Sequence, residues 1–134
     1  MINYKNLIKE AKYAMQFSYS PYSNFKVGAC VLTKSNKTYI GANIENASYG
    51  ATICAERVAI DNAIMNNDKE IICIAIMSSG NDFTFPCGIC RQVMAEFSNN
   101  IEIVVAKNEE DYKIYNIQEL LTHSFLSKDI KWEL

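Results

Sequence analysis

The sequence lacks any apolar stretch long enough to cross a bilayer. Its longest near-continuous apolar run, residues 71–77, covers seven positions, whereas a membrane-spanning helix needs about twenty. Residues 1–10 mix charged and polar side chains where a secretory signal peptide would have its apolar region. We therefore expect a cytoplasmic protein that makes no contact with a membrane.

A strong net charge is also missing. The 134 residues include 13 Lys and Arg against 15 Asp and Glu, which gives a formal net charge of -2. This balance excludes the general electrostatic attraction that a nucleic-acid polymer exerts on its binding proteins. No repeat, low-complexity tract or long linker divides the chain, so we expect a single domain over residues 1–134 with a core of its own.

Histidine is scarce, and the cysteines do not pair evenly. The only histidine, His123, lies in a polar segment, where we expect it at the surface. Five cysteines in a chain without an export signal argue against a disulfide framework and for reduced thiols that pack or hold a metal. Cys30 and Cys73 lie in apolar runs, so we expect them in the core.

Hydrophobic periodicity and turn residues predict the secondary structure. The predicted helices are 4–17, 53–66, 86–97 and 117–121, the third with Pro86 in its first turn. The predicted strands are 27–32, 38–44, 71–77, 102–106 and 112–115, the first two forming a hairpin. This order of elements indicates an α/β layered sheet.

Two short cysteine motifs give the strongest chemical signal, Cys-Ala-Glu at 54–56 and Pro-Cys-Gly-Ile-Cys at 86–90. Residues three apart on a helix have β-carbons about 5–6 Å apart, and two sulfurs bound to one zinc approach each other to nearly 4 Å, about what a Zn–S bond of 2.3 Å requires. Cys87 and Cys90 can therefore bind one ion together.

Cys54 can join them because of the expected topology. If the strand 71–77 lies between the helices 53–66 and 86–97, both helices begin at the same edge of the sheet. Cys54 and Cys87 then each lie in a first turn, where the helix dipole favours the thiolate. Three thiolates leave the fourth tetrahedral position open, which is typical of a catalytic zinc.

The two residues that follow this motif's alanine suit the same chemistry. Glu56 lies about 200° around the helix from Cys54, so we expect it beside the open position, where it can move protons. Zinc with three thiolates carries a net negative charge, which opposes the acidification of bound water. Arg57 is expected to offset that charge by donating a hydrogen bond to a thiolate, whereas Arg91 is expected in an ion pair or at the surface.

Two other classes of protein remain open on these motifs. A thiol–disulfide oxidoreductase also presents Cys-x-x-Cys at the start of a helix, but it needs neither Cys54 nor Glu56 and works without metal. A structural zinc module that binds a macromolecule needs a fourth ligand in the chain.

The motifs resemble the zinc deaminase signature in its all-cysteine form. The stretches 19–29, 41–49 and 87–94 are similar to the short, homotetrameric cytidine deaminases, and the resemblance covers nearly the whole chain. It implies a three-layer α-β-α fold with a central mixed sheet of about five strands, and a homotetramer. It also implies one Zn²⁺ per subunit, with Cys54, Cys87 and Cys90 as its ligands.

The reaction implied by the resemblance is the hydrolytic deamination of cytidine and 2′-deoxycytidine to uridine and 2′-deoxyuridine, with release of ammonia, in pyrimidine salvage. A zinc-bound hydroxide would attack C4 of the pyrimidine, while Glu56 carries the water's proton to N3 and later helps ammonia depart. A tRNA deaminase or a blasticidin deaminase remains open within the same enzyme class.

The resemblance also implies contacts with the nucleoside. Asn43 and Glu45 would hold the ribose 3′-hydroxyl, and Phe25 would pack against the nucleoside. The N–H of Ala55 would hold O2 of the ring, and the Phe85 carbonyl would receive the leaving amine.

One more aromatic residue belongs to the implied site, and two others remain unassigned. Phe125 would insert into a neighbouring subunit's active site, although Thr122 stands where the family commonly has a proline. For Tyr22 and Tyr49, ordinary packing and a place in the pocket both remain open.

Overall fold

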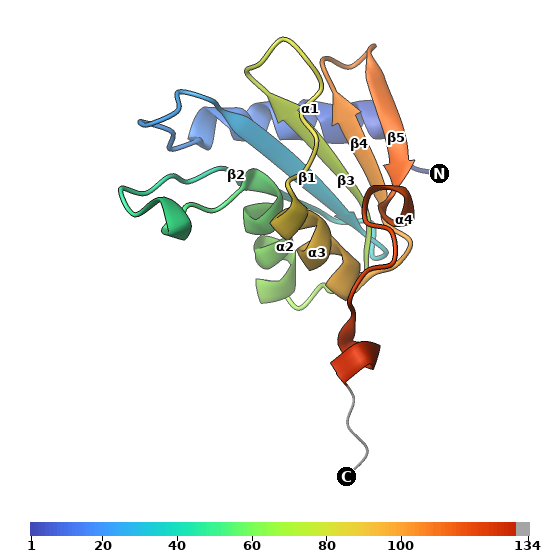
Figure 1. Cartoon of the computed structure of the whole chain (residues 1–134). Coiled ribbons are helices and arrows are strands. Elements are labelled where there is room, and N and C mark those ends of the chain that lie inside the picture. The colour runs from blue at the N-terminus through green and yellow to red at the C-terminus, as the bar shows by residue number, and fades with distance from the viewer. Residues whose placement is uncertain (131–134) are drawn as a thin grey trace.

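The computed structural model describes residues 1–130, which form a five-stranded mixed sheet with helices on both faces (Figure 1). The strands are β1 (Val27–Thr33), β2 (Thr38–Ala42), β3 (Ile71–Ser78), β4 (Glu102–Ala106) and β5 (Tyr112–Asn116). Their order is β2-β1-β3-β4-β5, with β3 and β4 parallel and the other neighbours antiparallel. The predicted three-layer fold is confirmed. Residues 131–134 of the predicted domain lie outside the described part.

The sheet separates the core into two parts, and helices cover both of them. The helices are α1 (Tyr4–Ala14), α2 (Ala55–Met65), α3 (Gly88–Phe97) and the short α4 (Ile117–Leu120), with 3-10 turns at Met15–Phe17, Tyr49–Ala51 and Ser127–Ile130. One face of the sheet is covered by α1, and the other by α2 and α3 (Figure 1). Cys30 and Cys73 are fully buried under α1, as predicted. Over residues 1–130, we find no helix with the length and apolarity that crossing a membrane requires.

Two helices begin later than predicted, and in both cases a cysteine is the N-cap. Ile53 forms an antiparallel bridge with Ile44, with both N–H···O distances 3.0 Å, so its extended backbone delays α2 to Ala55. Pro86 lies outside α3 rather than in its first turn, because Cys87 is extended and caps a helix that starts at Gly88. Neither Cys54 nor Cys87 uses its side chain to cap its helix, so both thiols remain available to another partner.

Two other predicted boundaries were too long. The hairpin strand 38–44 ends as β2 at Ala42, and the helix 4–17 changes after Ala14 to a 3-10 turn. Ile44 lies beyond the regular ladder because its backbone pairs with Tyr19 and Ile53 instead of with β1.

The connections around β3 place two helix starts at one edge of the sheet. The loop 66–70 joins the end of α2 to the start of β3, and the loop 79–87 joins the end of β3 to the start of α3. Both helices therefore begin at the edge where β3 ends, as the sequence predicts.

Gly41 in β2 allows α2 to lie close against the sheet. A β-carbon on Gly41 would come within 2.3 Å of the Ala59 nitrogen and 2.6 Å of the Ala55 oxygen. We expect Gly41→Ala to move α2 away from the sheet and to lower the free energy of unfolding by about 1–3 kcal/mol, measured by urea denaturation. Gly50→Ala is the matched control, since a β-carbon there meets no atom of residues 1–130 within 4 Å. Parent-like stability of Gly41→Ala would contradict this close packing.

Candidate functional site

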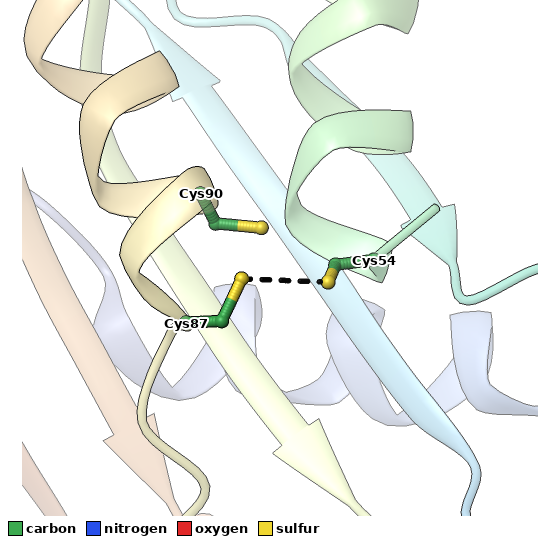
Figure 2. Close-up of side chains that lie close together, drawn as sticks. All are labelled: Cys54, Cys87 and Cys90. Atoms are coloured by element: carbon green, nitrogen blue, oxygen red, sulfur yellow. Dashed lines mark hydrogen bonds between the residues drawn. The ribbon is translucent and has the colours of Figure 1, made fainter. Parts of the chain in front are cut away.

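Three cysteine side chains from the starts of α2 and α3 point toward one another (Figure 2). The sulfurs of Cys54, Cys87 and Cys90 all lie within 4.8 Å of one another, and those of Cys54 and Cys87 are 3.6 Å apart. A tetrahedral zinc with Zn–S bonds of about 2.3 Å requires its sulfurs to be about 3.8 Å apart. The cluster therefore fits one zinc ion.

The cluster supplies three ligands and no more. Among residues 1–130, no further His, Cys, Asp or Glu joins the three sulfurs in a group that could hold a metal. Cys30 and Cys73 lie in the other core, and His123 is exposed. A structural zinc module would need a fourth ligand, and a dithiol redox site would not need the third sulfur, so the geometry favours a zinc with an open coordination position.

The thiols of Cys54 and Cys90 differ in how readily they ionise. A hydrogen bond with Cys90 lowers the pKa of Cys54 to about 5, and hydrogen bonds with Arg57 and Cys87 act in the same direction against burial. The hydrogen bond with Cys54, together with burial, raises the pKa of Cys90. Of these two thiols, Cys54 therefore ionises more readily, and zinc binding must displace the proton of Cys90.

Glu56 lies beside the sulfurs but does not belong to the ligand group. Its side chain is only 4% exposed. Burial raises the pKa of the Glu56 carboxyl to about 7, with the Cys54 thiolate adding to the rise, while hydrogen bonds from its own backbone N–H and from Cys90 oppose it. A buried carboxyl next to an open metal position can accept and return protons there.

Arg57, in the first turn of α2, contacts the cysteine cluster. Its Nη2 lies 3.7 Å from the Cys54 sulfur and 3.5 Å from the Thr52 carbonyl oxygen. The predicted hydrogen bond to a thiolate is therefore present. The Nε atom is buried and has no hydrogen-bond partner among residues 1–130, so the sulfur and the Thr52 carbonyl are the contacts that hold the guanidinium there.

Asn43 is buried and holds the segment that leads into β1. Its Oδ1 accepts hydrogen bonds from the Val27 N–H at 2.9 Å and the Ser18 hydroxyl at 2.5 Å. Its Nδ2 donates to the Phe25 carbonyl at 2.8 Å. An amide carries two N–H groups, and among residues 1–130 only this one hydrogen bond from Nδ2 is found.

Glu45 holds the neighbouring turn and lines an open groove. It accepts hydrogen bonds from the Tyr22 N–H at 2.9 Å, the Ser23 N–H at 3.1 Å and the Ser23 hydroxyl. The Ser23 hydroxyl lowers the pKa of Glu45, so the carboxylate is ionised. Tyr22, Ser23, Glu45, Tyr49 and Thr52 together line a groove of about 400 Å³, a volume within the usual range of ligand pockets.

The groove contains the two tyrosines that the sequence left unassigned, and its lining includes a residue close in sequence to Cys54. Tyr22 and Tyr49 both line it, with ring centroids 5.9 Å apart in an edge-to-face arrangement. Thr52 lies two residues before Cys54, and the Ile44–Ile53 bridge joins the chain beside Glu45 to the residue before Cys54. The backbone that carries Glu45 is therefore joined to the segment that leads into Cys54.

Four other residues predicted to contact the nucleoside do not line this groove. Phe25 is 38% exposed, and its ring lies against Gly80. Phe125 is 62% exposed and contributes only its carbonyl to a described hydrogen bond, from Gln92. Ala55 is the fully buried first residue of α2, whose N–H lies among the helix-start donors that lack an intrahelical partner. Phe85 packs its ring against Tyr115.

Arg91 is a residue whose contacts the sequence did not predict. It was expected in an ion pair or at the surface, but it is half-buried and donates to two backbone carbonyls, those of Pro86 and Leu120. Its position directly after Cys90 indicated that Arg91 lies near the cluster. Sequence spacing does not show which backbone carbonyls its side chain binds.

The comparisons with known proteins agree with this geometry. The family model of the cytidine and deoxycytidylate deaminase zinc-binding region matches residues 1–107. A cytidine deaminase of Halalkalibacterium halodurans is 41% identical over 125 residues, which cover 92% of this chain and 95% of the relative. One of Mycoplasma genitalium is 36% identical over 126 residues, covering 92% and 96%. The crystal structure of a cytidine deaminase from Burkholderia pseudomallei superposes with a TM-score of 0.88 at 38% identity, covering 92% of this chain and all of that one.

Proposed function

The chain belongs to the zinc-binding cytidine and deoxycytidylate deaminase family, and on that premise we propose that it converts cytidine to uridine and ammonia by hydrolysis. The observation that carries this proposal is the three-sulfur cluster with an open coordination position beside the buried Glu56. We extend the proposal to 2′-deoxycytidine as a second substrate and to a role in pyrimidine salvage in the cytoplasm.

Cys54, Cys87 and Cys90 are the proposed zinc ligands. A zinc ion held there would lower the pKa of a bound water molecule to near neutral. Arg57 offsets the excess negative charge of the three thiolates, because its guanidinium lies 3.7 Å from the Cys54 sulfur. That offset favours the ionisation of the attacking water.

Glu56 is the proposed proton carrier. Its carboxylate accepts the proton that the attacking water loses as the new bond to C4 forms, and it donates this proton to N3 of the pyrimidine. The same carboxyl then transfers the remaining hydroxyl proton to the amino group, the C4–N bond breaks, and ammonia leaves. The water oxygen remains on C4 as the carbonyl of uridine, so one carboxyl serves both halves of the reaction.

The nucleoside is held by polar groups on the same side of the fold. Glu45 lines the groove, and together with the second N–H of the Asn43 amide it can bind the ribose 3′-hydroxyl. The Ala55 N–H at the start of α2 is proposed to donate to O2 of the ring, and the Phe85 carbonyl to accept from the leaving amine. Phe25 is proposed to pack against the nucleoside.

A homotetramer is proposed to complete this site. Phe125 lies in the segment after α4 with most of its ring exposed, as a residue that enters a neighbouring subunit must be. We expect a native mass of four times the 15.2 kDa of one chain. Light scattering on the purified protein measures it, and a monomer with full activity would refute the proposed assembly.

Removing the Phe125 ring is expected to weaken substrate binding. A stacked aromatic contributes about 1–3 kcal/mol to the binding of a base, so Phe125→Ala should raise KM for cytidine by about tenfold. Steady-state kinetics test this, and Phe17→Ala, which removes another exposed aromatic ring, serves as the control. An unchanged KM in an intact Phe125→Ala tetramer would exclude Phe125 from the site.

The assignment itself is tested with cytidine and the zinc-loaded parent protein. We expect release of one ammonia for each uridine formed, followed by an ammonia assay and by ultraviolet absorbance. The competing redox interpretation is tested in parallel with insulin reduction by the zinc-free protein. Insulin reduction without any deamination of cytidine would overturn the proposed function.

A further inference from the structure

We propose that Arg91 is a positioning residue that fixes the backbone around the zinc ligand Cys87 and joins it to the segment carrying Phe125. This inference rests on the proposed zinc site and therefore on the proposed function. Arg91 is the first residue after Cys90 on α3, and it is half-buried.

Arg91 donates hydrogen bonds to the backbone carbonyls on both sides of the Cys87 α-carbon. Its Nε donates to the Pro86 carbonyl at 2.8 Å, and its backbone N–H donates to the Cys87 carbonyl at 3.0 Å. One residue therefore holds the carbonyl before Cys87 and the carbonyl of Cys87 itself.

The turn at Cys87 needs such support because other anchors are missing. Proline has no N–H to donate, so Pro86 can be held by hydrogen bonds only through its carbonyl. The Cys87 thiol does not cap α3, and the residue is exposed. Without the guanidinium, the carbonyl of the buried Pro86 would lose its partner, and the position of the Cys87 sulfur would be less defined.

The same guanidinium reaches the end of α4. Its Nη1 donates to the Leu120 carbonyl at 2.8 Å, across 29 positions of sequence. Because the guanidinium is planar and its N–H groups are fixed relative to one another, the Pro86 and Leu120 carbonyls are fixed relative to one another as well. Arg91 thereby links the cysteine turn to the C-terminal segment.

Gln92 holds the other end of that segment. Its Nε2 donates to the Phe125 carbonyl at 2.6 Å. Between the two attachment points, His123 has a left-handed backbone with φ of 51°. Since such a conformation is unfavourable for a residue other than glycine, the bonds from α3 help to keep this turn in place.

These contacts predict different effects for substitutions of Arg91 and of Gln92. Loss of the Arg91 guanidinium should loosen the cysteine turn and the C-terminal segment together. Loss of the Gln92 amide should loosen only the segment. Zinc affinity should therefore depend on Arg91 and not on Gln92, whereas KM for cytidine should depend on both.

Arg91→Lys is the direct test, because lysine keeps the charge but cannot hold two carbonyls in one plane. We expect its zinc affinity to fall by about 10- to 100-fold, the usual effect of removing a group that orients a metal ligand. Competition with a chromophoric chelator measures this on the metal alone, and the visible spectrum of the Co²⁺ protein reports the altered thiolate geometry. Gln92→Ala should bind zinc like the parent while raising KM, and Glu96→Gln on the same helix should change neither.

Unchanged zinc affinity and an unchanged Co²⁺ spectrum in folded Arg91→Lys would overturn the inference. If that variant does not fold, Arg91→Gln, which keeps one neutral donor, should show the same loss of zinc affinity. Failure of both variants to fold would also overturn it, since Arg91 would then serve general stability. A parent protein that binds zinc without deaminating cytidine would refute the proposed function and leave the metal readout of Arg91 intact.

Discussion

Glu56→Gln is expected to lower kcat for cytidine by about 10²- to 10⁴-fold, the contribution typical of a general acid–base group. Glutamine has nearly the shape of glutamate, but its amide cannot accept a proton from water and return it to the pyrimidine. Because Glu56 does not belong to the three-sulfur group, the variant should still bind one zinc per chain. Ammonia release and zinc content on the same preparation measure both quantities.

An exposed carboxylate on the same helix provides the control. Asp61 lies on α2 with its side chain in solvent, so Asp61→Asn should retain both zinc and activity. Parent-like turnover by Glu56→Gln would remove Glu56 from its role as proton carrier. Loss of zinc from Glu56→Gln would instead indicate that the carboxylate helps to hold the metal.

Cys90→Ser is expected to abolish zinc binding and deamination together. Cys90 is fully buried and lies within 4.8 Å of both other sulfurs. A serine hydroxyl does not ionise near neutral pH and is a poor zinc ligand. The loss of zinc affinity should therefore exceed the roughly 100-fold that removal of an outer partner of a ligand can cause. Chelator competition and an ammonia assay measure the two effects.

Cys73→Ala is the control that distinguishes an effect on metal binding from an effect on core packing. Cys73 is fully buried in β3, in the core under α1. Cys73→Ala should keep zinc and activity even if it lowers stability, since small core changes cost stability through packing. Full zinc affinity in Cys90→Ser would contradict the proposed ligand set.

Periodicity and topology were sufficient for much of the fold. The continuous apolar runs at 71–77 and 102–106 became the buried parallel strands β3 and β4. The meeting of Cys54 and Cys87 followed from the order of the elements, because the two helices flank β3 in the chain. The exact helix starts were missed, since a bridge between Ile44 and Ile53 is a long-range contact that local pattern does not contain.

Contacts between side chains and distant partners were the main features that the sequence could not supply. Asp68 Oδ2 accepts hydrogen bonds from the hydroxyls of Thr33, Ser35 and Tyr39 at 2.7–2.9 Å and so joins the β1–β2 hairpin to the loop after α2. Arg91 similarly meets the Leu120 carbonyl only in the folded chain. Neither contact has a spacing signature, because each depends on how remote segments come together.

The backbone contacts of Asn43 and Glu45 were not predicted from the sequence either. Their resemblance-based assignment to the sugar did not indicate that Asn43 also holds the Phe25 and Val27 backbone, or that Glu45 also holds the Tyr22 turn. These bonds fix the loop beside the groove. Substituting either residue would therefore disturb the loop as well as the proposed contact with the sugar.

X-ray absorption at the zinc edge of the purified protein is the most direct test of three cysteine sulfurs around one metal. We expect one zinc per chain, with three sulfur neighbours at about 2.3 Å and a single oxygen or nitrogen neighbour at about 2.0 Å. Four sulfur neighbours would contradict the open position, and fewer than three would contradict the joint ligation by Cys54, Cys87 and Cys90.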